Sequence, residues 1–187
     1  MFDPLIPIHP IVTADELKAI RKKYGFRRFL LAEPGLETRI FGVPGIEVFE
    51  RIADRLNALK DALTDTDIEI NWWCAPTIQC GVNSPLQHVV NWDGRESLDA
   101  LCPFDPEFRK LFSSWVARVA ELAHPPIILF EDDFRLKWHS IGIDQGCFCP
   151  FHLKALEKAT SRSWTREELV KIYQEDHFET HQQIKTE

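Results

Sequence analysis

The sequence predicts an α/β fold built from parallel β/α units of the TIM-barrel type, amounting to about half a barrel. Helix and strand patterns alternate along the chain, which favours parallel strands joined by helical crossovers. No glycine-rich turn joins a predicted strand to the next helix, which favours a barrel over a dinucleotide-binding sheet. An eightfold barrel takes about 250 residues, whereas this chain of 187 residues has three clear strand patterns and a weaker fourth. We expect a partial barrel domain over 1–175 and a polar tail over 176–187.

The first part of the chain predicts a strand, a helix and a second strand. The stretch PLIPIHP is the weak strand pattern. Thr13 and Glu16 form a capping-box signature and Gly25 is a suitable stop, so we expect a helix over 14–24. The apolar stretch that follows predicts a short buried strand over 26–32.

A second helix, a third strand and a long loop follow. Apolar residues at a period of 3.6 predict a helix over 45–63, and DIEINWWCAP predicts a strand that ends near Ala75. Residues 76–104 are rich in Gly, Asn, Pro and Asp and predict a long loop. Such a loop in a compact domain is more often functional than idle.

The third helix has the clearest start. Asp105 is a suitable N-cap, Pro106 suits the first helical position, and an unbroken apolar face follows. The run IILF then predicts a strand over 126–131 that is buried on both sides. Two shorter helices are expected over 151–159 and 166–175.

Composition excludes several classes of protein. The net charge is −7 and no Lys/Arg run is interleaved with aromatic residues, so a nucleic-acid partner is not expected. No apolar run approaches the roughly 20 residues of a membrane helix, and the N-terminus lacks signal-peptide features. We therefore expect a cytoplasmic protein. Five cysteines, an odd number, favour reduced thiols or a metal site over a disulfide framework.

Three consecutive acids, Glu131, Asp132 and Asp133, end the last predicted strand, and Arg135 and His139 follow closely. Barrel enzymes place their reacting groups at the carboxyl ends of strands. Neighbouring side chains on a strand point to opposite faces, so one acid is expected to act. A carboxyl group among apolar neighbours has a raised pKa and can serve as a general acid. The alternative is that these acids cap the loop and pair with basic side chains in solvent.

A C-x-C-x-x-H run formed by Cys147, Cys149 and His152 has the residue types of a zinc site. A closed tetrahedral site needs a fourth ligand, and Cys102 is the candidate because the connection that carries it is expected on the same face of the barrel. The alternative is that the cysteines are small buried packing residues and the histidine lies at the surface.

Three segments together resemble a known family: LCPFDPEFRKLFSSWVARVAELA, IILFEDDFRLKWH and GCFCPFHLKAL. They are similar to the N-terminal barrel of glycoside hydrolase family 42 β-galactosidases and to related uncharacterised barrel proteins. That family has a C-P-x-x-P helix start, a strand ending in Asn-Glu, and a C-x-C-x-x-C run. The resemblance covers residues 26–175 and is strongest over 101–155.

The resemblance implies a structural zinc ion. Cys102, Cys147 and Cys149 fall on three zinc-binding cysteines of the family, and His152 falls where the fourth would be. Zinc accepts either thiolate or imidazole in that position.

The resemblance also implies a carbohydrate substrate and assigns the acids. Asp133 falls on the acid/base Glu of the family and Asp132 on its Asn, while a shifted register would place Glu131 there. The nucleophile of a retaining glycosidase lies about 5 to 5.5 Å from the acid, and in this family it lies on the seventh strand. We therefore expect the remainder of the barrel, or a second copy of the chain, as a partner. A fragment of a longer protein and a decayed gene product remain open.

Other side chains are candidates for substrate binding. We expect contacts from Arg39, Arg135 and His139, with Trp72 and Trp92 stacking against sugar rings. One alternative is a non-catalytic carbohydrate-binding or assembly module that uses Trp72, Trp73 and Trp92 as stacking surfaces for sugar rings. Another is an unrelated metal-dependent barrel enzyme, in which the zinc would keep an open position for water.

Overall fold

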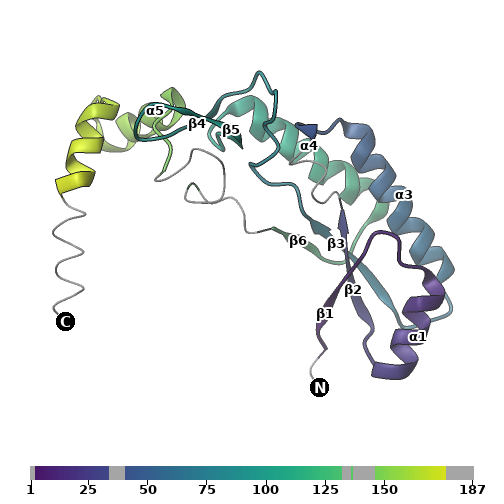
Figure 1. Cartoon of the computed structure of the whole chain (residues 1–187). Helices are drawn as coiled ribbons and strands as arrows, with labels where there is room; N and C mark the ends of the chain where they lie inside the picture. The colour runs from purple at the N-terminus through teal and green to yellow at the C-terminus, as the bar shows by residue number, and fades with distance from the viewer. Residues whose placement is uncertain (1–2, 34–40, 132–135, 137–145, 176–187) are drawn as a thin grey trace, which may run out of the picture.

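The computed structural model of the chain describes residues 3–33, 41–131, 136 and 146–175. Its centre is a four-stranded sheet in which every neighbouring pair is parallel. The strands follow one another across the sheet in chain order, as Figure 1 shows. They are β1 (Leu5–Ile8), β2 (Arg28–Glu33), β3 (Glu69–Cys74) and β6 (Ile128–Phe130). The predicted α/β fold with parallel strands is confirmed for this sheet.

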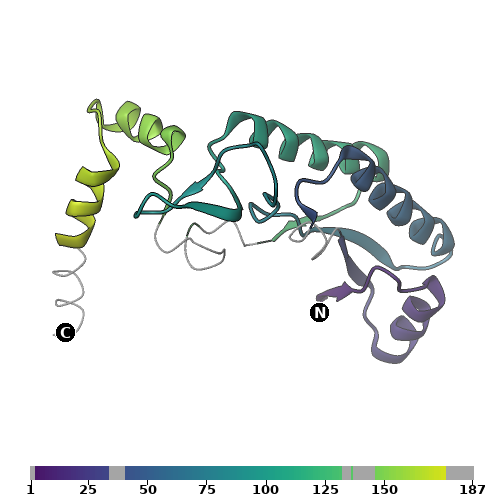
Figure 2. The same ribbon diagram turned by 45° about the horizontal axis from the view of Figure 1, so that its top comes forward.

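Three helices cover one side of the sheet: α1 (Ala14–Tyr24), α3 (Ile46–Ala62) and α4 (Pro106–Ala123). Helices α3 and α4 run side by side in both Figure 1 and Figure 2. A fourth helix, α5 (Pro150–Thr160), and the helical residues 166–175 extend away from the sheet. Among the described residues, none of the helices combines the length and the apolar character that crossing a membrane requires.

Capping residues set both ends of α1 and the start of α4 at the positions that the sequence predicts. Thr13 and Glu16 form the reciprocal capping box of α1, and Gly25 ends this helix at a φ of +81°. Asp105 caps α4 by accepting from the backbone N–H groups of Glu107 and Phe108. These contacts satisfy backbone donors that have no partner inside the helix.

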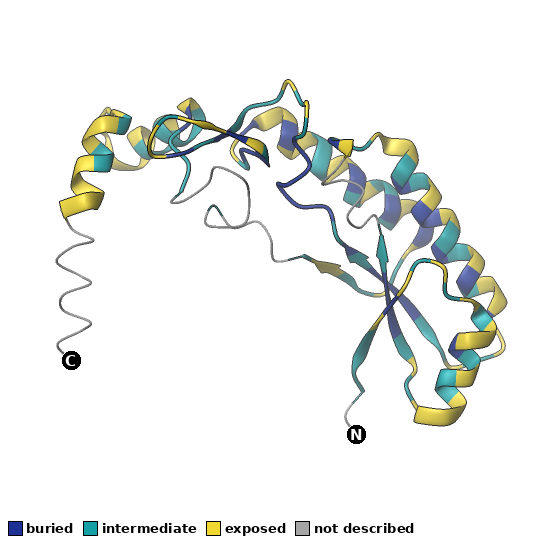
Figure 3. Cartoon of the chain, viewed as in Figure 1, coloured by how far each residue is buried: buried dark blue, intermediate teal, exposed yellow. Residues whose placement is uncertain are grey.

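The hydrophobic core lies between the sheet and its three helices, as the buried residues in Figure 3 show. Phe49 of α3 stacks on Trp115 of α4 with ring centroids 4.9 Å apart, and it meets the edge of Trp72 from β3. Alternation along the strands sends Leu31 and Trp72, which are paired in register, into this core.

Two expectations about strands were wrong. The segment predicted as a loop over 76–104 contains an antiparallel hairpin, formed by β4 (His88–Val90) and β5 (Glu96–Leu101). Its turn contains Gly94 at a φ of +87°, a backbone conformation that favours glycine. Strand β6 was predicted to be buried on both sides, yet Leu129 and Phe130 are 39% and 49% exposed. The reason is that β6 lies at an edge of the described sheet. The predicted tail over 176–187 lies outside the described residues.

Candidate metal centre

Three separate parts of the chain bring the candidate metal ligands together. Cys102 follows β5 directly, Cys147 and Cys149 precede α5, and His152 lies in the first turn of α5. The backbone of Cys102 is fixed from both sides, since its N–H donates to Gln87 O and its carbonyl accepts from Asp105 N–H. The hairpin and the start of α4 therefore hold Cys102 in place.

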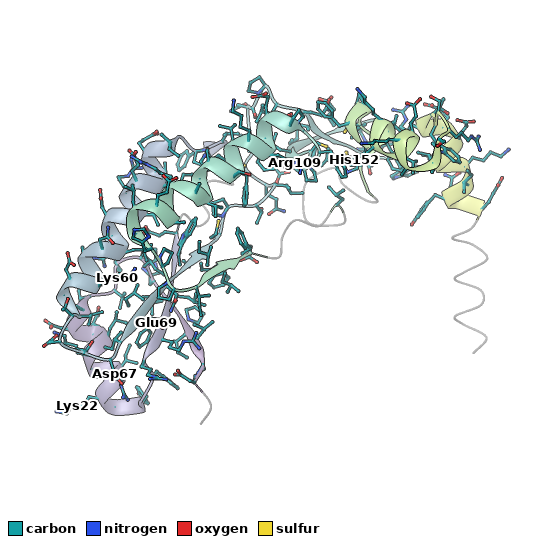
Figure 4. The ribbon with its side chains drawn as sticks, turned by 180° about the vertical axis from the view of Figure 1, so that it is seen from behind. Lys22, Lys60, Asp67, Glu69, Arg109 and His152 are labelled. Carbon is teal, nitrogen blue, oxygen red and sulfur yellow. The ribbon has the colours of Figure 1, made fainter. Side chains whose placement is uncertain are left out.

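The four side chains converge on one point. His152 Nδ1 lies 3.2 Å from Cys102 Sγ and 3.5 Å from Cys149 Sγ, and the two sulfurs are 3.3 Å apart. With Cys147 included, all four ligand atoms lie within 4.8 Å of one another. Figure 4 shows His152 where α5 meets the hairpin. Tetrahedral zinc with sulfur ligands at about 2.3 Å separates those sulfurs by about 3.8 Å, so the sulfurs of Cys102 and Cys149, now 3.3 Å apart, would move apart by about 0.5 Å to hold an ion between them.

The cluster is shielded from solvent. Cys102 and Cys149 are completely buried, whereas Cys147 and His152 are partly buried. The ring of Phe104 covers the imidazole of His152 at a centroid distance of 4.5 Å. Shielding of this kind strengthens the attraction between a metal ion and its thiolate ligands.

Backbone N–H groups point at the sulfurs. Phe104 N–H donates to Cys102 Sγ at 3.3 Å, and Val90 N–H donates to Cys147 Sγ at 3.4 Å. Cys149 is the N-cap of α5, where the positive end of the helix dipole lies. Each sulfur thus has a nearby partial positive charge, which stabilises the thiolate form that binds metal.

The side chains of the cluster shift one another's pKa values in different directions. Hydrogen bonds with Cys102 and then Cys147 lower the pKa of Cys149. Hydrogen bonds with Cys147 and Cys149 raise the pKa of Cys102. Burial lowers the pKa of His152, but hydrogen bonds with Cys147 and Cys149 outweigh burial and raise it to about 9. A bound metal ion would replace the protons of these side chains.

The predicted grouping of Cys102, Cys147, Cys149 and His152 is confirmed, and this group could hold a metal ion. The two remaining cysteines lie elsewhere in the core. Burial raises the pKa of both Cys74 and Cys80 to about 12, so they remain protonated thiols.

Of the three consecutive acids at the end of β6, the structure describes only Glu131. Glu131 is partly buried, and its N–H donates to Cys74 O at 3.1 Å, which continues the contact between β3 and β6. The other predicted catalytic residues, Asp132 and Asp133, lie outside the described residues. The predicted substrate-binding residues Arg39, Arg135 and His139 also lie outside them.

The two tryptophans predicted to stack against sugar rings, Trp72 and Trp92, differ in their exposure to solvent. Trp72 is completely buried, and its indole N–H donates to Glu33 O at 2.7 Å. It therefore cannot offer a ring face to a sugar, and the prediction was wrong for this residue because alternation turns it toward the helices. Trp92 lies in the hairpin turn and is 37% exposed.

Sequence reasoning missed the residues that support the cluster. The contacts of Val90 and Phe104 with sulfur come from backbone groups, so no side-chain pattern marks them. Asp105 was predicted only as a helix cap, but its carboxylate also accepts from Gln87 N–H at 2.8 Å. This bond ties the start of the hairpin to α4.

Comparison of the chain with protein-family models, with curated proteins and with solved structures gave no match.

Proposed function

We propose that the chain is part of a β/α barrel of the glycoside hydrolase family 42 type, stabilised by a structural zinc ion. The observation that carries this proposal is the convergence of Cys102, Cys147, Cys149 and His152 within 4.8 Å. The ligand types and their order along the chain are those that the resemblance to this family implies.

The donor set favours zinc in a structural role. Three thiolates and one imidazole suit tetrahedral zinc, whereas magnesium and calcium prefer oxygen ligands. Four protein ligands leave no position for a catalytic water, which argues against a metal-dependent enzyme at this site. The ion would fasten the end of the hairpin to the start of α5, in addition to the backbone hydrogen bond that Phe148 N–H donates to Val90 O at 2.8 Å.

The sheet supports the barrel part of the proposal. In a barrel the strand order follows the chain and all helices lie outside, whereas a doubly wound sheet reverses its order and has helices on both faces. The order β1, β2, β3, β6 and the placement of α1, α3 and α4 on one side agree with the barrel. The remainder of the barrel, or a second copy, would then pair with the edges at β1 and β6.

The catalytic part of the proposal assigns Asp133 as the general acid that protonates the oxygen leaving a glycosidic bond. Both flanks of its segment are held in place. Glu131 N–H donates to Cys74 O on one side, and Gly146 N–H donates to Leu136 O on the other. Cys147 follows Gly146 directly, so zinc would anchor the chain that leaves the carboxyl end of β6.

The first test is the zinc content of the chain, measured by elemental analysis after purification without chelators or added metal. We expect about one zinc per chain, and a loss of that zinc in a Cys147→Ser, Cys149→Ser variant. Absence of zinc from freshly reduced wild-type protein would contradict the proposed site.

The second test addresses hydrolysis, in a form of the protein that contains the complete barrel. Asp133→Asn is expected to lower the hydrolysis of an aryl β-galactoside by a factor of about 10² to 10⁴ without changing the zinc content. Asp132→Asn and Glu131→Gln are the matched comparisons, because each removes one neighbouring carboxylate. Full activity of Asp133→Asn would contradict the assignment, and full loss only in Glu131→Gln would move the role to that residue.

A further inference from the structure

The two adjacent tryptophans of β3 lie on opposite faces of the sheet. Trp72 belongs to the core cluster beneath the helices, with Leu31 and Ile128 as its register partners. Trp73 is absent from that cluster and, by alternation, points to the opposite face. That face would be the inside of the barrel.

The polar atom of the Trp73 side chain is its indole Nε1. This atom is buried, yet it has no hydrogen-bond partner among the described residues. The other indoles with assigned bonds differ, because Trp72 donates to Glu33 O and Trp164 donates to Thr160 Oγ1, each at 2.7 Å. Unsatisfied buried donors are rare in native proteins, so the partner of this donor lies outside the described residues, and an oxygen atom of a ligand would satisfy it.

The position of Trp73 suits a ligand contact. Trp73 is the penultimate residue of β3, close to the carboxyl end of the sheet, where barrels bind their ligands. Its register partners on β2 and β6 are Ala32, which is small, and Leu129, which is 39% exposed. The indole therefore has a small side chain on one side and a partly exposed apolar one on the other.

We propose that Trp73 is a carbohydrate-binding residue whose indole N–H donates to a hydroxyl oxygen of the sugar while its ring contacts the apolar face of the sugar. This inference rests on the proposed function, which makes the inside of the barrel the sugar-binding face. An indole can make both contacts, because it combines a large apolar ring for the apolar face of the sugar with one N–H donor for a hydroxyl oxygen.

The test follows indole signals by NMR in protein labelled with ¹⁵N-tryptophan, with methyl β-D-galactoside as the probe. The chain has six tryptophans, so each indole N–H gives its own signal. Trp73→Phe removes the donor and keeps a ring. Trp164→Phe is the matched control, because it makes the same change in the segment between α5 and the helical residues 166–175.

We expect the Trp73 signal to shift saturably with the sugar in wild-type protein and in Trp164→Phe, with the same Kd. Trp73→Phe should bind roughly 3- to 10-fold more weakly. If Trp73→Phe fails to fold, the wild-type Trp73 signal, identified by its through-space contacts with Ala32 and Leu129, decides the question in the same way.

A Trp73 signal that does not move up to the solubility limit of the sugar would overturn the inference, as would an unchanged Kd in Trp73→Phe. The zinc measurement separates this failure from that of the proposed function. A fixed Trp73 signal in zinc-loaded protein would overturn the sugar contact alone. A saturable shift in protein that never holds zinc would support the contact and contradict the metal site.

Discussion

Cys102 Sγ lies 3.2 Å from His152 Nδ1, although 50 residues separate the two in the chain. Nothing local brings them together: the hairpin and the start of α4 fix Cys102, and α5 carries His152. A metal ion bound between them would tie these parts together in the folded state only. Binding free energy would therefore become folding free energy.

The first prediction compares two buried cysteines. Cys102→Ser is expected to abolish zinc binding, whereas Cys80→Ser, a change of the same kind at a completely buried thiol outside the cluster, should retain it. With zinc at 1,000 times its Kd, the wild-type Tm should exceed that of chelator-treated protein by roughly 10 °C. Calorimetry with and without chelator checks this, and an equal chelator effect in both variants would refute the ligand assignment.

The second prediction concerns the aromatic centre of the core. Phe49→Ala should lower the free energy of unfolding by about 3–5 kcal/mol, because it removes the ring that lies between Trp115 and Trp72. Phe41→Ala makes the same change at a side chain that is 82% exposed and should cost no more than about 0.5 kcal/mol. Urea denaturation measures both, and comparable losses would contradict the packing.

The third prediction concerns the link between the hairpin and α4. Asp105→Ala removes the cap of α4 and also the acceptor for Gln87 N–H, so it should destabilise the protein by about 1–2 kcal/mol. Asp105→Asn retains an acceptor oxygen and should recover most of that loss. If the two variants are equally unstable in urea, the carboxylate acts through its charge and not through these hydrogen bonds.

The fourth prediction is a pH dependence at the opposite end of the sheet. Hydrogen bonds from Arg21, at 2.7 and 2.8 Å, lower the pKa of Asp67 below its usual value of 3.8. A lowered folded-state pKa stabilises the protein above the unfolded pKa, and this contribution is lost as the pH falls through the folded value.

Asp67→Asn should therefore lower the Tm by at most a few degrees at pH 7, because the pair is exposed, and the difference should vanish in strong acid. Asp54→Asn removes the same charge from an exposed position of α3 and serves as the control. Melting curves from pH 7 down to acid decide the matter, and a constant difference between the variants would argue against the pairing.

Much of the fold follows from local rules. The limits of α1 and the start of α4 agree with the sequence because capping at Thr13 and Asp105 involves residues that are neighbours in the chain. The hairpin of β4 and β5 was missed because β4 has only three residues and the composition of the segment is that of a loop. Burial of β6 was overestimated because an apolar run does not reveal whether a strand lies at an edge.

The sequence by itself determined the types of ligand at Cys102, Cys147, Cys149 and His152, since donor chemistry is a property of the residue. Only the tertiary structure decided that these side chains meet within 4.8 Å, because the positions of two helices and a hairpin fix that distance. It also decided which tryptophan faces the core. Trp72 and Trp73 are chemically equal in the sequence, and the helices that pack on one face of the sheet make them different.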